Sequence, residues 1–247
     1  MEIKDKELHQ ITSTAMLNQL KKELKQVADP ARARHESRYF KTGKGEYGEG
    51  DIFLGIKTAY KRKLAKKYSQ LSLKDVEYLI SSKFHDYRFI ALVILINKYQ
   101  KGDKQEKKQI FNFYLKNTQH INNWDLVDIS APNIIGDYLL DKDRKILYKL
   151  VKSKSLWERR ISVLATFRFI KENQFKDALK ISEILLNDKH DLIHKAVGWM
   201  LRQVGKKDQM EEEKFLLKHY QKMPRIMLRY AIERFKENKR QFYLKKT

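Results

Sequence analysis

Apolar residues recur at the spacing of an α-helix along almost the whole 247-residue chain, and convincing strand alternation is absent. Only three prolines and nine glycines interrupt this pattern. Hydrophobic residues make up 42% of the chain, which is enough for a real core and excludes a disordered basic tail. The sequence therefore predicts an all-α protein.

The helical pattern breaks into many short segments joined by only a few residues, which is typical of antiparallel helix pairs. We expect one domain over residues 1–247, with N-terminal helices and a glycine-rich connector in 1–57 and stacked helical repeats in 58–240. The predicted helices cover residues 8–27, 31–41, 58–68, 73–82, 85–100, 104–117, 123–140, 143–153, 156–171, 174–187, 191–205, 209–221 and 224–237.

Four segments resemble one another, since each places basic residues at the start of an apolar helix. Their equivalent residues, spaced by 72, 35 and 34 positions, are Arg88, Arg160, Lys195 and Arg229. The first step is twice the others, and its midpoint falls at Trp124. A period near 35 residues predicts an α-solenoid of HEAT-like, armadillo-type repeats with a concave basic surface. An ordinary helical bundle with chance periodicity is the alternative.

The charge of the chain points to a polyanionic partner. Lysine and arginine number 53 against 31 aspartates and glutamates, a formal charge of +22 that is spread along the whole sequence. Such a field favours nucleic acid through phosphate contacts. A lysine-rich surface that only keeps the protein soluble is the alternative. A membrane surface is not expected, because no stretch combines a basic face with an exposed bulky apolar one.

Several other classes are excluded by what the sequence lacks. No cysteine is present, which removes disulfides, iron–sulfur clusters and thiolate zinc sites. His190 and His194 are four residues apart but lack the acid of a His-Glu-x-x-His pattern, so we expect no metal and no cofactor. The charged N-terminus is unlike a signal peptide, and the longest apolar run, 89–96, is too short to cross a bilayer. We expect a cytoplasmic protein.

An aromatic residue and an acid stand one helical turn apart at Trp124 and Asp128. On a helix they lie on the same face, where they suggest a site for a positive charge that forms on nucleic acid. A salt bridge to a neighbouring repeat is the alternative role of Asp128. Asp125 follows Asn122 and Asn123 in a first helical turn, so we assign it mainly to structure.

The other tryptophans and an arginine pair have ordinary explanations from the residues alone. Trp199 lies among apolar residues, so core packing is its default role, and Trp157 begins a helix as a hydrophobic staple. Arg159 and Arg160 point about 100° apart, so that one faces the basic surface and the other faces solvent.

The glycine-rich stretch 43–50 contains the pattern G-x-G-x-x-G. A dinucleotide-binding fold needs a strand before this pattern, and here a polar segment precedes it. The Gly-Lys-Ser/Thr ending of a phosphate-binding loop is also absent. We interpret the stretch as a flexible connector.

Four segments together match a known pattern. They are Arg38–Ile56, Trp124–Asp128 with the Ser-Ala-Pro that follows, Leu156–Arg160 and Ala196–Arg202. In their order and spacing the chain resembles the AlkD-type DNA alkylation repair family, DNA glycosylases built from HEAT-like repeats. The match spans residues from about 30 to 205. Ala59 stands where relatives often have proline, and no motif matches after about residue 206.

The resemblance implies hydrolysis of the N-glycosidic bond of N3- or N7-alkylated purines, 3-methyladenine and 7-methylguanine, in duplex DNA without a deep base-flipping pocket. Its site residues would be Trp124, Asp128, Arg160 and Trp199. Asp128 would stabilise the oxocarbenium-like sugar, the tryptophans would face the cationic sugar and base, and Arg160 would hold a phosphate.

Further contacts to double-stranded DNA are expected from basic residues in the matched and repeated segments, in a protein that acts as a monomer. They are Arg88, Arg159, Lys195, Arg202, Arg229 and Lys44. A non-enzymatic HEAT-like protein that binds distorted or branched DNA is the alternative, and it would not need Asp128. A protein-binding scaffold fits the fold but leaves the charge unexplained.

Overall fold

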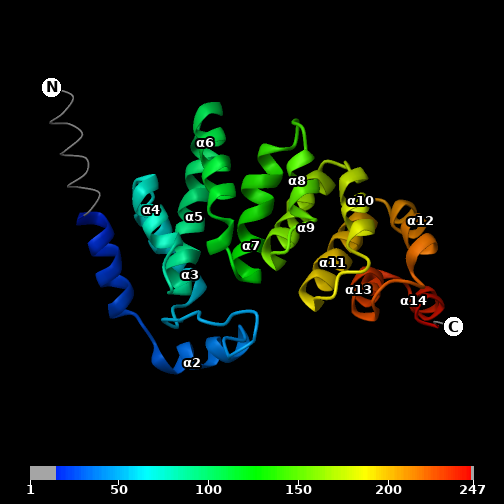
Figure 1. Cartoon of the computed structure of the whole chain (residues 1–247), viewed down its shortest axis with the longest axis horizontal. Helices are drawn as coiled ribbons and strands as arrows, with labels where there is room; N and C mark the ends of the chain where they lie inside the picture. The colour runs from blue at the N-terminus through cyan, green and yellow to red at the C-terminus, as the bar shows by residue number, and fades with distance from the viewer. Residues whose placement is uncertain (1–14, 246–247) are drawn as a thin grey trace. The chain divides into compact units, whose positions relative to one another are not determined.

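The computed structural model of the chain describes residues 15–245 (Figure 1). Contacts divide the chain into two compact units, residues 1–130 and 131–247. The described part is all-helical, as predicted, and its one β pairing is an isolated parallel bridge between Ile52 and Phe84. No described helix combines the length and apolarity that a membrane crossing requires. The expected organisation as a single domain stays a prediction.

The first unit is built around α5 (His85–Lys101), which is buried along most of its length and against which α3 (Thr58–Lys67), α4 (Leu73–Ile80) and α6 (Lys104–Lys116) pack. A helix over residues 15–26 precedes these elements. The predicted helix 8–27 therefore lies partly outside the described residues. The other elements are α2 (Pro30–Tyr39), the 3₁₀ turn η1 (Thr118–His120) and α7 (Trp124–Ala131).

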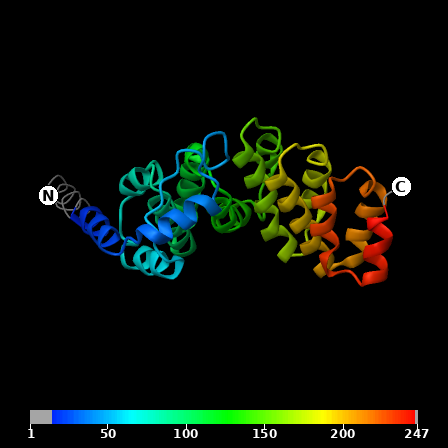
Figure 2. The same cartoon turned by 90° about the horizontal axis from the view of Figure 1, so that it is seen from below.

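The second unit has two layers of helices. Helices α9 (Leu156–Lys171), α11 (Asp191–Lys207) and α13 (Arg225–Ala231) pack in succession. Helices α8 (Lys145–Leu150), α10 (Lys176–Ile184) and α12 (Gln209–His219) cover their other side (Figures 1 and 2). The other elements of this unit are the π-helical turn η2 (Pro132–Gly136), the 3₁₀ turn η3 (Ile232–Arg234) and α14 (Glu237–Leu244).

The predicted repeat of two helices is confirmed in the second unit. Its inner helices α9, α11 and α13 begin 35 and 34 residues apart, and each follows one partner helix, α8, α10 or α12. Local caps set two of these starts. The Ser155 hydroxyl accepts from the Glu158 amide at 3.4 Å, and the His190 ring accepts from the Leu192 amide at 3.1 Å.

Two predicted helices differ from the structure. The helix expected over 123–140 is helical over 124–138, but at Pro132, which has no amide proton to continue the α-helical ladder, it changes to the π-helical turn η2. The helix expected over 224–237 ends at Ala231, and α14 follows it unforeseen. The apolar pattern of α14 is weak, and Tyr243 is its one fully buried residue.

An arm formed by residues 29–55, which includes α2, docks on the corner between α4 and α5 (Figure 2). The Ile52 amide donates to the Lys83 carbonyl at 3.1 Å, and the His85 amide donates to the Ile52 carbonyl at 2.8 Å. At Gly55, φ is +76° and an added Cβ would collide with the Asp29 carbonyl, so only glycine fits this contact. The bonds of Ile52 therefore fix the end of the arm to the segment before α5, and the close contact at Gly55 holds that end against the start of α2.

Glu212 on α12 is a buried acid, 2% exposed, whose carboxyl packs against Gly205 of α11. A side chain at Gly205 would overlap that carboxyl. Among the described residues the Glu212 Oε1 has no hydrogen-bond partner. Burial, with the nearby charge of Glu213 adding to it, raises the pKa of Glu212 to about 9. The folded protein therefore holds Glu212 as a neutral acid at pH 7.

We expect Glu212→Gln to stabilise the protein above pH 5. A carboxyl whose pKa is raised on folding binds more protons when folded, so the free energy of unfolding falls as pH rises from about 4.5 towards about 9. The glutamine side chain does not titrate, so the variant keeps the free energy of unfolding that the wild type loses. The difference should be on the order of a few kcal/mol at pH 8 and vanish near pH 4. Urea unfolding followed by circular dichroism at several pH values measures it. Substitution of the exposed Glu172 by Gln is the control. If the free energy of unfolding changes with pH equally in the wild type and in Glu212→Gln, the raised pKa of Glu212 is contradicted.

Candidate functional site

Trp124 and Asp128 lie one turn apart on α7, and both are half-buried. The Trp124 amide donates to the Asn123 side-chain oxygen at 2.8 Å, which fixes the helix start at the tryptophan. Asp128 is close enough to the buried Tyr114 to affect it. Burial raises the pKa of Tyr114, and the negative charge of Asp128 adds to the rise. The ring and the carboxylate thus occupy one partly exposed face, as the spacing predicts.

Aromatic side chains of the arm hold the Trp124 ring. Phe40 stacks on it with 5.3 Å between ring centroids and 18° between planes, and Tyr39 meets it edge-on at 6.0 Å. Phe40 also stacks on Phe53 at 4.9 Å. Tyr39 itself is 59% exposed. The sequence did not predict these contacts of Tyr39 and Phe40 with Trp124, although both residues lie in a segment that carries the family resemblance.

A hydrogen bond between a histidine and an aspartate fixes the same turn of α7 to the start of α5. His85 is fully buried, and its ring contacts those of Phe53, at 4.4 Å between centroids, and Phe40, at 5.1 Å. Its Nε2 is 2.9 Å from the Asp125 Oδ1. The structural role predicted for Asp125 therefore extends to a tertiary bond that orients the residue next to Trp124.

A buried carboxylate joins the arm to α5 and to the start of α7. Asp51 accepts from the Arg88 Nη2 at 2.6 Å and from the side-chain Nδ2 of Asn123 at 3.2 Å. Arg88 also donates from Nη1 to the Ser82 carbonyl at 2.8 Å. All three side chains of the Asp51 network, Asp51, Arg88 and Asn123, are buried. The expectation that Arg88 lies on an exposed basic surface is therefore wrong, because the guanidinium neutralises an internal acid.

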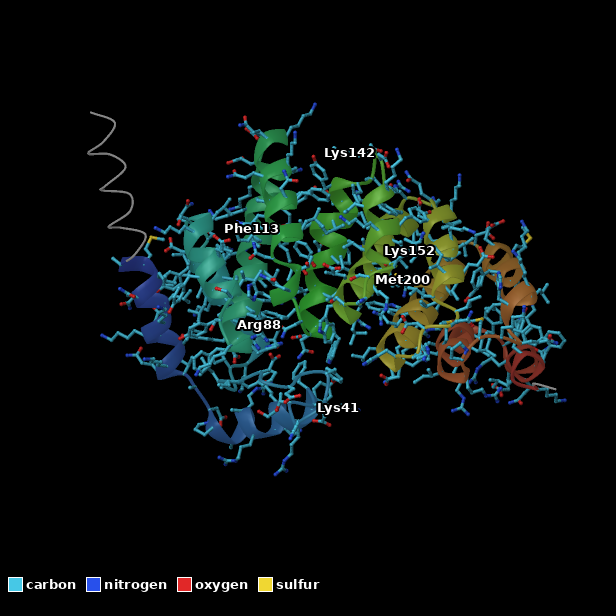
Figure 3. All side chains as sticks on the ribbon, in the orientation of Figure 1. Lys41, Arg88, Phe113, Lys142, Lys152 and Met200 are labelled. Atoms are coloured by element: carbon cyan, nitrogen blue, oxygen red, sulfur yellow. The ribbon has the colours of Figure 1, made fainter. Side chains whose placement is uncertain are left out.

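The glycine-rich stretch forms a series of tight turns within the arm. The Gly43 and Gly45 amides donate to the carboxylates of Glu46 and Glu49, both at 2.8 Å. These glutamates bind the stretch's own backbone. Lys44 is exposed and makes no ion pair within the described residues, and Figure 3 shows its neighbour Lys41 at the turn that follows α2.

In the second unit, Arg160 and Trp199 occupy different levels of the α9–α11 pair. Arg160 is 5% exposed and donates from Nη1 to the Leu192 carbonyl at 2.5 Å. Trp199 follows Leu192 by two turns, about 10 Å along the helix axis. The half-exposed Trp199 faces Phe167 at 5.9 Å. The structure does not bring Arg160 and Trp199 into contact, and their assigned roles stay predictions.

The other basic residues expected to bind DNA are of two kinds. Lys44 and Arg229 are exposed and form no ion pair in the part of the chain that the structure describes. The remaining three are paired with acids of their own unit: Arg159 with Asp188, Lys195 with Asp191, and Arg202 with Glu233. The Lys195–Asp191 pair lies at the surface, whereas the Arg159 and Asp188 side chains are only 18% and 6% exposed.

Within residues 15–245 no three histidine, cysteine, aspartate or glutamate side chains come together in a way that could hold an ion.

Comparison with known proteins decides the family. A family model described as "DNA alkylation repair enzyme" matches residues 20–235. The chain belongs to this family. The matched range includes the arm, α7 and the repeats of the second unit. No curated protein matches the chain.

Solved structures of low sequence identity share the fold of this family member. A predicted DNA alkylation repair enzyme from Enterococcus faecalis is 17% identical, with a TM-score of 0.68 over 85% of this chain and 97% of the other. The protein smu.31 from Streptococcus mutans is 18% identical, with a TM-score of 0.50 over 90% of this chain and 98% of the other. At such identities the likeness concerns the fold alone.

We expect Arg88→Met to lower the free energy of unfolding by about 3–5 kcal/mol, because it leaves Asp51 as an unpaired buried charge. Arg229→Met removes the same side chain from an exposed position and should change stability by about 0.5 kcal/mol or less. Chemical denaturation of both variants tests the difference. Equal losses would contradict the structural role of Arg88.

Proposed function

We propose that this member of the DNA alkylation repair enzyme family is a glycosylase that hydrolyses the N-glycosidic bond of N3- and N7-alkylated purines in duplex DNA, with 3-methyladenine and 7-methylguanine as substrates. The pair Trp124 and Asp128 carries the proposal, because it presents a ring and a carboxylate one turn apart on a partly exposed helix face. The sequence resemblance assigns the same two residues to catalysis.

The chemistry needs little acid catalysis. An N3- or N7-alkylated purine already carries a positive charge, so the bond to the anomeric carbon breaks with its electron pair going to the base, which leaves neutral. The deoxyribose then resembles an oxocarbenium ion. The Asp128 carboxylate would stabilise that charge and accept the proton of the water whose oxygen bonds to the anomeric carbon. The products are the free base and an abasic site.

Trp124 would provide a π face for the cationic sugar and base. Its ring is restrained by Phe40 and Tyr39, so little motion would have to be frozen when DNA binds. Asp125, bound to His85, would act as a positioning residue for the same turn. A rigid, partly exposed face suits recognition of a lesion that is not drawn into a deep pocket.

Duplex DNA would be held mainly through its phosphates, as the charge of +22 favours. Lys44 and Arg229 are the exposed candidates, and Arg159, Lys195 and Arg202 would first exchange their internal acids for phosphate. On the resemblance, Arg160 is assigned to a phosphate and Trp199 to a cationic base or sugar. We further propose that the protein works as a monomer in the cytoplasm, on the nucleoid.

Asp128→Asn is expected to reduce release of 7-methylguanine from methylated duplex by about 100-fold or more, since the neutral amide cannot stabilise the developing charge. The affinity of this variant for duplex DNA should stay within about threefold of that of the wild type, because the Asp128 carboxylate is not one of the groups that bind phosphates. Single-turnover base release and fluorescence anisotropy measure the two effects. Exposed Asp141→Asn is the matched control, and equal excision by Asp128→Asn and wild type would rule out the role of Asp128.

The non-enzymatic alternative makes a different forecast for the same assay. A protein that only binds distorted or branched DNA would release no base from methylated duplex and would prefer a junction to a linear duplex. Release by the wild type, lost in Asp128→Asn, excludes that alternative.

Affinity for unmodified duplex should fall steeply with salt, as a straight line of log Kd against log salt concentration. Lys44→Ala and Arg229→Ala should each reduce the slope by about one, since each removes one phosphate contact. Anisotropy titrations across a salt series measure the slope. A flat response in the wild type would contradict phosphate-dominated binding.

A further inference from the structure

A groove of about 840 Å³ lies in the second unit between α10 and α12. Its floor is apolar and consists of Phe175, Leu179 and Phe215. Phe175 and Leu179 are half-buried and Phe215 is buried. The groove therefore offers apolar surface that helices of its own unit cover only in part.

Two rows of lysines border this floor. Lys176 and Lys180 follow one another by one turn on α10, and Lys214 and Lys218 do the same on α12. Residues four apart share a helix face, so each row runs along its edge of the groove. All four lysines are exposed.

The lysines exceed the acids that accompany them. Glu183 lies 2.9 Å from the Lys180 ammonium and 3.2 Å from that of Lys218, and Glu211 lies 2.6 Å from that of Lys214. Among the described residues Lys176 makes no ion pair. The border thus keeps a positive excess, and Glu183 links α10 to α12.

Apolar surface continues beyond the lysine row of α12. Met210 and Leu217 are 71% and 60% exposed. They lie four residues before and three residues after Lys214, which puts them on the stripe beside it. Large exposed apolar side chains next to an apolar groove are typical of a protein-binding surface.

The groove is separate from the residues assigned to DNA in this unit. Helices α10 and α12 belong to the outer layer, whereas Arg160 and Trp199 lie on α9 and α11 of the inner layer (Figure 1). The inference below goes beyond the proposed function and does not depend on it.

We propose that the groove between α10 and α12 binds an amphipathic helix of an acidic partner protein. The apolar stripe of that helix would cover Phe175, Leu179 and Phe215, and its carboxylates would meet the two lysine rows. This is helix-in-groove recognition, with charge complementarity at the rim. Nucleic acid fits less well, because a phosphate backbone would leave the apolar floor uncovered.

The test uses the full chain and a short synthetic helical peptide that carries leucines at every third or fourth position, glutamates on both flanks and a fluorescent label. Anisotropy should report saturable binding to the wild type. A peptide with lysines in place of the glutamates should not bind. No saturable binding of the acidic peptide would overturn the proposal.

Matched charge reversals locate the binding site. Lys176→Glu with Lys214→Glu should weaken the acidic peptide by about tenfold or more, since both rows lose attraction. Lys206→Glu with Lys207→Glu makes the same change in net charge at the exposed end of α11 and should leave binding unchanged. Equal affinity of the two double variants would overturn the proposal.

A substitution in the floor separates apolar contact from charge. Leu179→Asp should weaken the peptide by about tenfold, while Leu179→Met should bind like the wild type. Circular dichroism establishes that each variant is folded. If an unlabelled duplex displaces the peptide, and Lys176→Glu with Lys214→Glu weakens duplex and peptide by the same factor, the groove binds nucleic acid and the proposal is wrong.

Discussion

The organisation of the first unit depends on one buried carboxylate, that of Asp51. Arg88 without this partner would be an uncompensated charge in the interior, and Asp51 without Arg88 would be the same. The second oxygen of Asp51 accepts from the side-chain Nδ2 of Asn123, and the side-chain oxygen of Asn123 in turn accepts from the Trp124 backbone amide. The position of the candidate catalytic tryptophan is therefore connected, through two hydrogen bonds, to an ion pair in the core.

Much of the fold could be predicted because its signals are local. Helical periodicity and a step near 35 residues depend on neighbours in sequence, and α9, α11 and α13 begin where the pattern indicates. The role of Arg88 could not be read in this way. A basic residue at a helix start looks the same in sequence whether it faces solvent or an acid brought to it from a distant loop. The contact of Phe40 with Trp124 is hidden for the same reason.

The same difficulty applies to the basic residues that mark the repeats. Arg160 donates to a carbonyl at the start of the next inner helix, and Arg88 neutralises an acid of the arm. Both arginines bind neighbouring elements of their own unit, whereas Arg229 at the corresponding place is exposed. A positive charge that recurs with the repeat is thus partly a means of joining elements. The structure is needed to distinguish arginines that bind elements of their own unit from arginines that are exposed and can bind a polyanion.

The docking of the arm has a consequence for how the first unit opens. The arm brings Asp51, Phe40 and Phe53 together, and Gly55 allows its last turn to approach α2 closely. If the arm detached, the charge of Arg88 would be left without its counterion, the Asn123 cap would lose its support and the Trp124 ring would lose its stacking partner. These losses occur together, so the arm and the start of α7 form a single cooperative unit of local unfolding. The surroundings of Trp124 that the candidate site depends on are therefore complete only while the arm is docked.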